Sequence, residues 1–208
     1  MAEELSTKQK ILVEALNLFA EKGYEAVSVG QIADAVGIKA PSLYKHYKSK
    51  QDIFDAILAE MDERYKQQAN AMQLNGTNPT QDAKVYETIS EDTLVEMGRN
   101  LFLYFLHDEY TAKFRKMLTV EQYHSKELAD LYSRQYVDDV LSYQGMIFHL
   151  LSQVGILKDE KPKIMALQFY APIYLLLTLC DRQPKREEEC LNLLEEHIRQ
   201  FNRFLGIR

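Results

Sequence analysis

Residues 28–57 read SVGQIADAVGIKAPSLYKHYKSKQDIFDAI. Ser28 and Gln31 match a Ser-x-x-Gln capping box, which predicts that a helix begins directly after Ser28. Gly37 is expected to end this short helix, because glycine adopts the left-handed conformation of a helix terminus most easily. Pro41 suits the first turn of a new helix, where its missing N–H is not needed. Two short helices joined by a glycine turn predict a helix-turn-helix.

The segments on either side of this stretch also predict helices. On the N-terminal side, a second capping box begins at Ser6, and the helix is expected to end at Gly23. On the C-terminal side, Ser49 is expected to cap a long helix that runs to about residue 73, before NGTNPTQD (75–82) breaks it. The apolar residues of that helix recur at spacings of one, three or four: Ile53, Phe54, Ile57, Leu58, Met61 and Tyr65.

The rest of the chain is predicted to be helical as well. Apolar residues recur with a period near 3.6, and no stretch alternates as a strand would. Helices are expected near residues 83–106, 110–121, 124–155, 161–182 and 186–205. The predicted fold class is therefore all-α, with a small N-terminal domain of residues 1–50 and a larger helical domain of residues 51–208.

The charge of the helix-turn-helix differs from that of the chain around it. The formal charge of the 208 residues is −6, yet residues 37–50 hold four lysines and no carboxylate. In a helix-turn-helix the second helix enters the major groove of DNA, and its first residues face the bases. Lysines supply salt-dependent affinity for phosphate, while Tyr, Ser and His donate directed hydrogen bonds. Helical spacing turns Leu43 and Tyr47 inward, so that Ser42, Tyr44, Lys45 and His46 are left to face DNA.

The alternative for such a lysine-rich segment is a solvated helix face, which is more common when charge is the only signal. Here the capping boxes, the glycine turn and the restriction of the cations to the second helix occur together. This combination favours DNA binding over the solvated face.

The string at residues 28–57 also resembles the tetracycline-repressor (TetR) family of bacterial transcription regulators. It has a hydroxyl residue, Ile-Ala, Gly-Ile, Ser-Leu-Tyr, an aromatic residue and then Ser-Lys before a long fourth helix. The resemblance covers about residues 6–60, and the other three quarters of the chain match only in helical architecture and in short stretches. It implies that Ser28 touches phosphate and that Tyr44 and Lys50 clamp the DNA backbone. The DNA-binding set that it implies is Ser28, Val29, Lys39, Ala40, Pro41, Ser42, Tyr44, Lys45, His46 and Lys50.

The last two helices are expected to form a dimer interface. The final helix carries apolar residues at steps of 3, 4, 3 and 4, a seam that favours a partner helix: Leu191, Leu194, Ile198, Phe201 and Leu205. The helix before it is apolar nearly all round, which is more surface than one neighbour covers. A four-helix bundle closed by a two-fold axis is therefore predicted, as the resemblance also implies, and would favour a palindromic DNA site. The alternative is that this seam belongs to the core of a single chain.

The middle helices are expected to enclose a pocket for a small-molecule effector. Its candidate residues are the polar, aromatic or flexible side chains on otherwise apolar segments: Met61, Tyr65, Arg99, Tyr104, His107, Tyr143, His149, Tyr170 and Tyr174. Thirteen tyrosines and no tryptophan suggest a drug-like, aromatic or lipid-like effector. Effector binding is expected to displace the fourth helix, so that the two DNA-binding heads of the dimer no longer fit successive major grooves.

Other classes of protein find less support. No nucleophile–base pair or carboxylate pair suggests an enzyme, and no cofactor or metal site is predicted, because Cys180 and Cys190 have no metal-ligand spacing. The N-terminal MAEELSTKQK lacks the apolar core of a signal peptide, which predicts a cytoplasmic protein. The apolar segment 164–180 is interrupted by Gln168 and Pro172 and is predicted to be a buried helix. A helical small-molecule carrier with a degenerate DNA-binding motif remains the alternative function.

Overall fold

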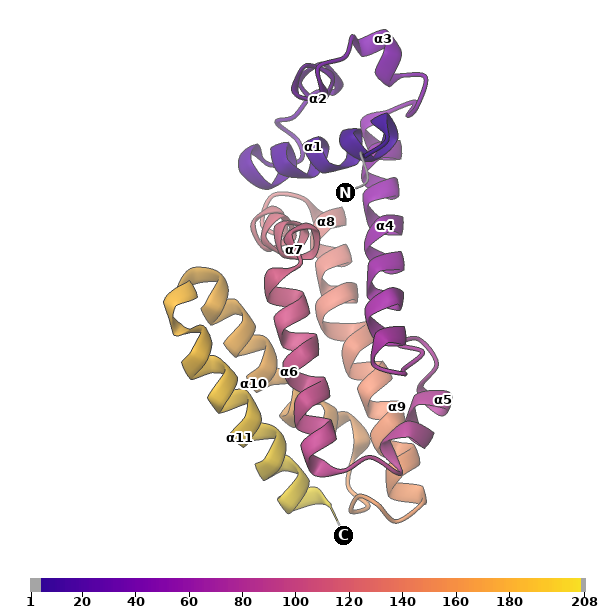
Figure 1. Ribbon diagram of the computed structural model, residues 1–208, viewed down its shortest axis with the longest axis vertical. Coiled ribbons are helices and arrows are strands. Elements are labelled where there is room, and N and C mark those ends of the chain that lie inside the picture. Colours follow the sequence, from indigo (N-terminus) through magenta and orange to yellow (C-terminus); the bar gives the residue numbers. More distant parts are fainter. Residues whose placement is uncertain (1–4, 207–208) are drawn as a thin grey trace. The chain divides into compact units, whose positions relative to one another are not determined.

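The computed structural model describes residues 5–206, and the fold class predicted from the sequence is confirmed: the described residues form helices joined by turns, with one isolated β-bridge between Leu157 and Gly206 (Figure 1). The chain folds as two compact units. The first comprises the described part of Met1–Arg64 together with Glu109–Tyr132, and the second comprises Tyr65–Asp108 and the described part of Ser133–Arg208. Helix α4 begins in the first unit and ends in the second.

The first unit contains the predicted helix-turn-helix. Its helices are α1 (Thr7–Lys22), α2 (Val29–Val36), α3 (Ala40–Leu43), the first part of α4 (Lys50–Ala71), α7 (Glu109–Glu121) and α8 (Lys126–Ser133). Both predicted Ser-x-x-Gln capping boxes are present, since Ser6 and Ser28 each accept a hydrogen bond from the backbone N–H three residues later. Ser49 caps α4 in the same way, by accepting from Asp52 N at 3.0 Å.

An aromatic cluster forms the core of the first unit and includes a helix that is distant in sequence. Phe19, Tyr24 and Phe54 pack ring against ring, and Phe114 of α7 lies 6.0 Å from Phe54 between ring centroids. Lys113 of α7 also donates a hydrogen bond of 2.6 Å to Asn17 of α1. Helix α7 is therefore part of the same compact unit as the helix-turn-helix. The functional division at residue 50 stays a prediction.

The second unit is a helical bundle with two clusters of buried apolar residues. Its helices are α5 (Pro79–Tyr86), α6 (Glu91–His107), α9 (Asp139–Gln153), α10 (Pro162–Arg182) and α11 (Glu187–Leu205). One cluster joins α6, α10 and α11 around Phe102, Cys180 and Leu194, and the other joins α9 to α10 around Ile147 and Met165. Arg199 of α11 pairs with the start of α6, at 2.9 Å from Glu91.

Two of the predicted helices are divided in the structure. Residues 83–106 form α5 and α6 in place of one helix, because Ser90 accepts from Thr93 N at 3.1 Å and begins a new helix there. Residues 124–155 form α8, the π-helical turn Arg134–Asp138, and α9. Neither division coincides with a glycine or proline, which are the breakers that sequence patterns detect best.

The residues predicted to form the dimer seam lie in the core of the chain. Leu191, Leu194 and Ile198 pack against α6 and α10, and Leu194 is 0% exposed. Phe201 and Leu205 pack on the cluster around Ile147. Intramolecular neighbours thus bury Leu191, Leu194 and Ile198, as the alternative of a single-chain core expects, while Phe201 and Leu205 are half-buried. The assignment of these five residues to a dimer interface stays a prediction.

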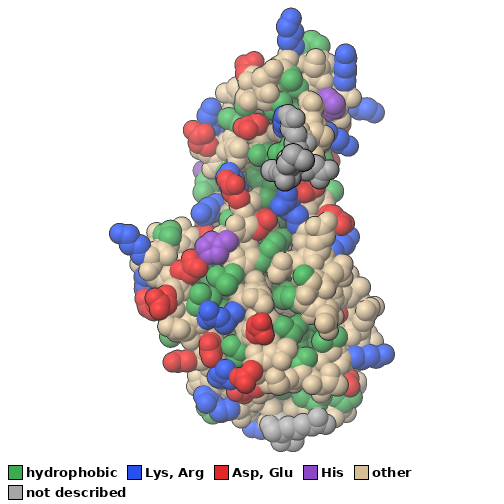
Figure 2. All heavy atoms as spheres, viewed as in Figure 1, with side chains coloured by type: hydrophobic (Ala, Val, Ile, Leu, Met, Phe, Trp, Pro, Cys, Tyr) green, Lys and Arg blue, Asp and Glu red, His purple; other side chains and the backbone are tan. Residues whose placement is uncertain are grey.

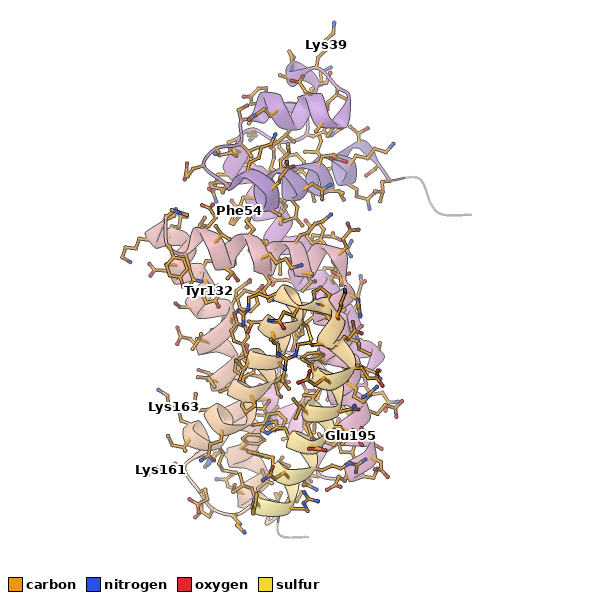
Figure 3. All side chains as sticks on the ribbon, turned by 90° about the vertical axis from the view of Figure 1, so that its left-hand side faces the viewer. Lys39, Phe54, Tyr132, Lys161, Lys163 and Glu195 are labelled. Atoms are coloured by element: carbon orange, nitrogen blue, oxygen red, sulfur yellow. The ribbon has the colours of Figure 1, made fainter. Side chains whose placement is uncertain are left out.

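Helix α10 presents a second apolar face that the chain leaves open. Ile164 and Leu167 are each 47% exposed and Leu175 is 61% exposed, while Met165, Leu176 and Cys180 on the opposite side are buried. Figure 3 shows α10 and α11 side by side in the second unit. By length and composition α10 could cross a membrane, and 28% of its most apolar window is buried. The chain's own helices thus cover only part of α10, which agrees with the expectation that this helix has more apolar surface than one neighbour covers.

Candidate nucleic-acid interface

The turn of the helix-turn-helix depends on Gly37. Its backbone has φ 78° and ψ 29°, the left-handed region that favours glycine, and a side chain there would be strained. The Ile38 N–H returns to the Ala33 carbonyl at 3.0 Å, so that the chain leaves α2 sharply. This geometry places α3 directly after α2.

Helix α3 is a single turn whose buried and exposed sides match the prediction. Leu43 is fully buried and Tyr47 is buried behind it. Pro41, Tyr44, Lys45 and His46 are exposed, Ala40 and Ser42 are half-buried, and Tyr44 is 52% exposed despite its size. After Leu43 the chain continues as turns, with His46 N donating to Leu43 O at 2.8 Å. The predicted contact residues therefore share one short, solvent-facing segment.

The cations of this segment carry no internal partner. Among residues 5–206, no carboxylate pairs with the ammonium groups of Lys39, Lys45 or Lys48. Lys113 and Lys126, by contrast, each pair with a carboxylate four residues away. Figure 2 shows Lys side chains standing out around α2 and α3, and in Figure 3 Lys39 points outward from the helix-turn-helix. The surface is therefore suited to polyanion phosphates.

At the start of α2, the two predicted residues have different surroundings. The Ser28 side-chain oxygen is exposed but already accepts the Gln31 N–H at 3.2 Å as the helix cap. Val29 is half-buried. The hydroxyl hydrogen of Ser28 is the group that this arrangement leaves to donate to a phosphate.

Lys50 stands apart from the other cations. Its ammonium donates to the backbone carbonyls of Tyr24 and Glu25, at 2.8 and 3.3 Å, and its side chain is 23% exposed. The structure thus places the Lys50 ammonium against the α1–α2 turn, whereas the resemblance implies a clamp on the DNA backbone.

Tyr47 has a buried hydroxyl without a hydrogen-bond partner. Burial raises the pKa of this phenol, so the group remains protonated and its desolvation is uncompensated. We expect Tyr47→Phe to leave the free energy of unfolding unchanged or to raise it by up to about 1 kcal/mol. Chemical denaturation measures this change, and a loss of more than about 1 kcal/mol would show that the hydroxyl has a partner in solution.

In the second unit, two of the predicted effector residues converge on a carboxylate that the sequence did not single out. Asp82 is fully buried and accepts from the backbone N–H groups of Asn75 and Gly76, at 2.6 and 2.8 Å, and from the Tyr143 hydroxyl. Burial and this hydrogen bond raise the pKa of Tyr143, and burial and the Asp82 charge raise that of Tyr65. An Asp in the first turn of a helix is ordinarily a surface residue near the positive end of the helix dipole, so no sequence signal marked its burial.

The other predicted pocket residues are dispersed. Tyr170 donates to the carbonyl of Tyr136 in the π-helical turn at 2.9 Å, and the Tyr174 ring packs beside both. The remaining members do not come together. Tyr104 packs edge-on against Phe105, and Nε2 of the exposed His107 lies 2.9 Å from Oε1 of Glu187. His149 is exposed, Arg99 is half-buried, and Met61 belongs to the first unit.

A groove of about 320 Å³ lies in the second unit at the start of α10. It is lined by Glu160, Lys161, Ile164, Met165, Gln168 and Leu205, and Figure 3 labels Lys161 beside it. None of these lining residues belongs to the predicted effector set. The effector pocket stays a prediction.

The similarity of this chain to known sequences is concentrated in the first unit. Residues 11–57 match the family described as bacterial regulatory proteins, tetR family. The HTH-type transcriptional regulator AcrR of Shigella flexneri is 42% identical over 55 residues, which are 26% of each chain. The HTH-type negative transcriptional regulator IcaR of the biofilm operon icaADBC in Staphylococcus aureus is 46% identical over 48 residues, 23% of this chain and 26% of that protein. The chain thus spans about a quarter of the length of these curated relatives.

Solved structures match along almost the whole chain. The SmeT–triclosan complex, whose protein represses the SmeDEF multidrug efflux pump of Stenotrophomonas maltophilia, has a TM-score of 0.70 at 18% identity and covers 97% of this chain and 92% of that one. A TetR family transcriptional regulator from Pseudomonas syringae has a TM-score of 0.66 at 17% identity, with 97% of both chains covered. At these identities the likeness shows a shared fold.

Proposed function

We propose that this chain, whose residues 11–57 form a DNA-binding domain of the TetR family, is a transcriptional regulator in the cytoplasm: a homodimeric repressor that binds a palindromic operator and is released by a small-molecule effector. The observation that carries the proposal is the exposed segment around α3, where three lysines without carboxylate partners lie beside Tyr44 and His46. The chain as a whole is acidic, yet this segment carries cations without carboxylate partners, which suits it to contact phosphates.

Dimerisation is proposed to use the open face of α10. Exposed Ile164, Leu167 and Leu175 recur at helical spacing on this face, and Leu193 and Phe204 add exposed apolar surface on α11. A contiguous apolar surface of this kind on a soluble protein marks an interaction site. Two copies related by a two-fold axis would bury the same face of each chain and present two α3 segments to two half-sites.

Effector binding is proposed for the second unit. The solved structure of SmeT with triclosan gives one example of this fold holding a small aromatic compound. The tyrosines around Asp82 and around the π-helical turn supply aromatic rings and hydroxyl groups for such a ligand. Helix α4 runs from Lys50 in the first unit to Ala71 in the second, so a shift of α4 would couple effector to DNA binding. A coupling free energy of about 1–3 kcal/mol is enough to change operator affinity noticeably.

The variant Lys39→Ala/Lys45→Ala tests the assignment of the DNA-binding surface. Both side chains are exposed and unpaired, so the fold and the dimer should be unaffected. Operator affinity is expected to fall at least ~10-fold, and the slope of log affinity against log salt should become shallower by about one for each phosphate that is no longer neutralised. Fluorescence titrations at several salt concentrations measure both quantities.

The matched control is Lys66→Ala/Lys84→Ala, which removes two exposed lysines from α4 and α5. This control has the same change in net charge and should bind like the original protein. If the two double variants lose the same affinity, the effect is one of overall charge and the surface is misassigned. If neither loses affinity, a helical carrier of small molecules becomes the better account.

A further inference from the structure

The ammonium group of Lys50 is enclosed by the turn between α1 and α2. It donates hydrogen bonds to Tyr24 O at 2.8 Å and to Glu25 O at 3.3 Å, and it lies 4.4 Å from the centroid of the Tyr24 ring. The Glu25 carboxylate is 4.0 Å away. Every one of these contacts favours a positive charge at this position, through carbonyl dipoles, a ring face and a carboxylate.

A second hydrogen bond joins the same two segments in the opposite direction. The Tyr24 hydroxyl donates to Gln51 Oε1 at 2.8 Å. Burial raises the pKa of Tyr24 to about 12, so this phenol stays protonated and able to donate at physiological pH. The Tyr24 ring is itself fixed edge-on against Phe19 and Phe54, with centroids 5.1 and 4.9 Å away. Residues 24–25 and 50–51 are thus connected by three hydrogen bonds, two donated by Lys50 and one donated by Tyr24.

This connection lies directly before the start of α2. The Tyr24 carbonyl that accepts from Lys50 also accepts from the Val27 N–H at 3.4 Å, and Val27 is buried directly before the Ser28 cap. Between the buried Tyr24 and Val27, Glu25 and Ala26 are exposed. A displaced turn would therefore displace Ser28 and the start of α2, which belong to the proposed DNA-binding surface.

Lys48 offers a comparison two residues earlier in the chain. It is exposed, and no carboxylate among residues 5–206 pairs with it. Lys48 is free to approach phosphate, whereas two of the three N–H donors of the Lys50 ammonium are already bonded to carbonyls and its side chain is only 23% exposed.

We infer that Lys50 is a positioning residue for DNA binding: it holds the α1–α2 turn against the start of α4 and so places Ser28 and α2, and it does not itself contact phosphate. This inference rests on the proposed DNA-binding function. It replaces the phosphate clamp that the family resemblance implies at this position. The Lys50 ammonium thus interacts with carbonyls of its own domain, and the cations that give DNA affinity are those around α3.

Lys50→Met and Lys48→Met separate the two roles, because each removes one charge and keeps most of the aliphatic chain. For Lys50→Met we expect a thermal unfolding midpoint about 3–8 °C lower and a weaker operator affinity, with an unchanged slope of log affinity against log salt. For Lys48→Met we expect an unchanged midpoint and a slope shallower by about one, because one phosphate is no longer neutralised. Differential scanning fluorimetry and titrations at four salt concentrations supply these values.

Tyr24→Phe provides a second, milder variant in case Lys50→Met folds poorly. It removes only the hydroxyl that donates to Gln51, and a lower midpoint with an unchanged salt slope is expected again. Lys50→Arg should recover part of the midpoint, because a guanidinium can also donate to the two carbonyls.

A shallower salt slope for Lys50→Met, with or without a lower midpoint, would overturn the inference, because it would show that Lys50 neutralises a phosphate. An unchanged midpoint for both Lys50→Met and Tyr24→Phe would also overturn it. If the original protein binds DNA no better than random sequence, the proposed function fails instead. The comparison of unfolding midpoints then still decides whether Lys50 holds the turn.

Discussion

Replacing Leu167 and Leu175 by glutamate is expected to convert the proposed dimer to monomers and to lower operator affinity by at least ~100-fold. The two side chains are 47% and 61% exposed on the open face of α10, so the fold of the single chain does not depend on them. In a two-fold dimer the substitutions would bring four carboxylates together in one apolar contact. Monomers also lose the advantage of binding two linked half-sites, which is worth roughly 10²–10⁴ in affinity. Analytical ultracentrifugation and operator titrations measure the two effects.

Val154→Glu serves as the control for this variant. Val154 is an exposed apolar residue at the end of α9 and lies outside the α10 face. Its replacement should change neither the mass of the assembly nor the operator affinity. A Leu167→Glu/Leu175→Glu protein that remains a dimer with full affinity would show that the interface lies elsewhere.

The second large effect is expected at Asp82. Asp82→Ala leaves three donors without their acceptor, namely the N–H groups of Asn75 and Gly76 and the hydroxyl of Tyr143. Since each buried donor left without a partner costs about 1–3 kcal/mol, we expect the free energy of unfolding to fall by about 3–5 kcal/mol. Urea denaturation followed by circular dichroism measures the loss.

Tyr143→Phe provides a graded comparison, because it removes one of the three donors and keeps the carboxylate in place. A loss of about 1 kcal/mol is expected for this variant. If Asp82→Ala costs no more than Tyr143→Phe, the carboxylate does not hold the turn between α4 and α5.

The sequence predicts the helix-turn-helix well because its determinants are local. A capping box needs only Ser28 and Gln31, and the turn needs only the conformational freedom of Gly37. The inward positions of Leu43 and Tyr47 follow from helical spacing over four residues. Signals of this kind act within one turn of the chain and do not depend on distant partners.

The second unit is harder to predict because its determinants are not local. The 3–4 spacing of Leu191, Leu194 and Ile198 indicates a covered face, but the sequence does not say whether α6 and α10 or a second chain covers it. The buried position of Asp82 depends on a turn that folds back onto it. The same difficulty arises in the first unit at Lys50, whose contact with Tyr24 joins residues 26 positions apart.

The lysines of the first unit differ in their interaction partners, which separates structural lysines from those proposed to bind DNA. Lys113 and Lys126 pair with carboxylates on their own helices, and Lys50 is held by carbonyls, while the lysines around α3 are unpaired. With a formal charge of −6, the chain as a whole is not attracted to DNA. Contact with DNA is therefore expected to be confined to the α3 segment and its flanks.

The central claim is that this chain is an operator-binding regulator, and the most direct test is the binding of the purified protein to the DNA that flanks its own gene, measured at several salt concentrations against a scrambled sequence. The account predicts tight, steeply salt-dependent binding to one palindromic site, with two chains per site. Binding that is no stronger than to the scrambled sequence at every salt concentration would contradict it.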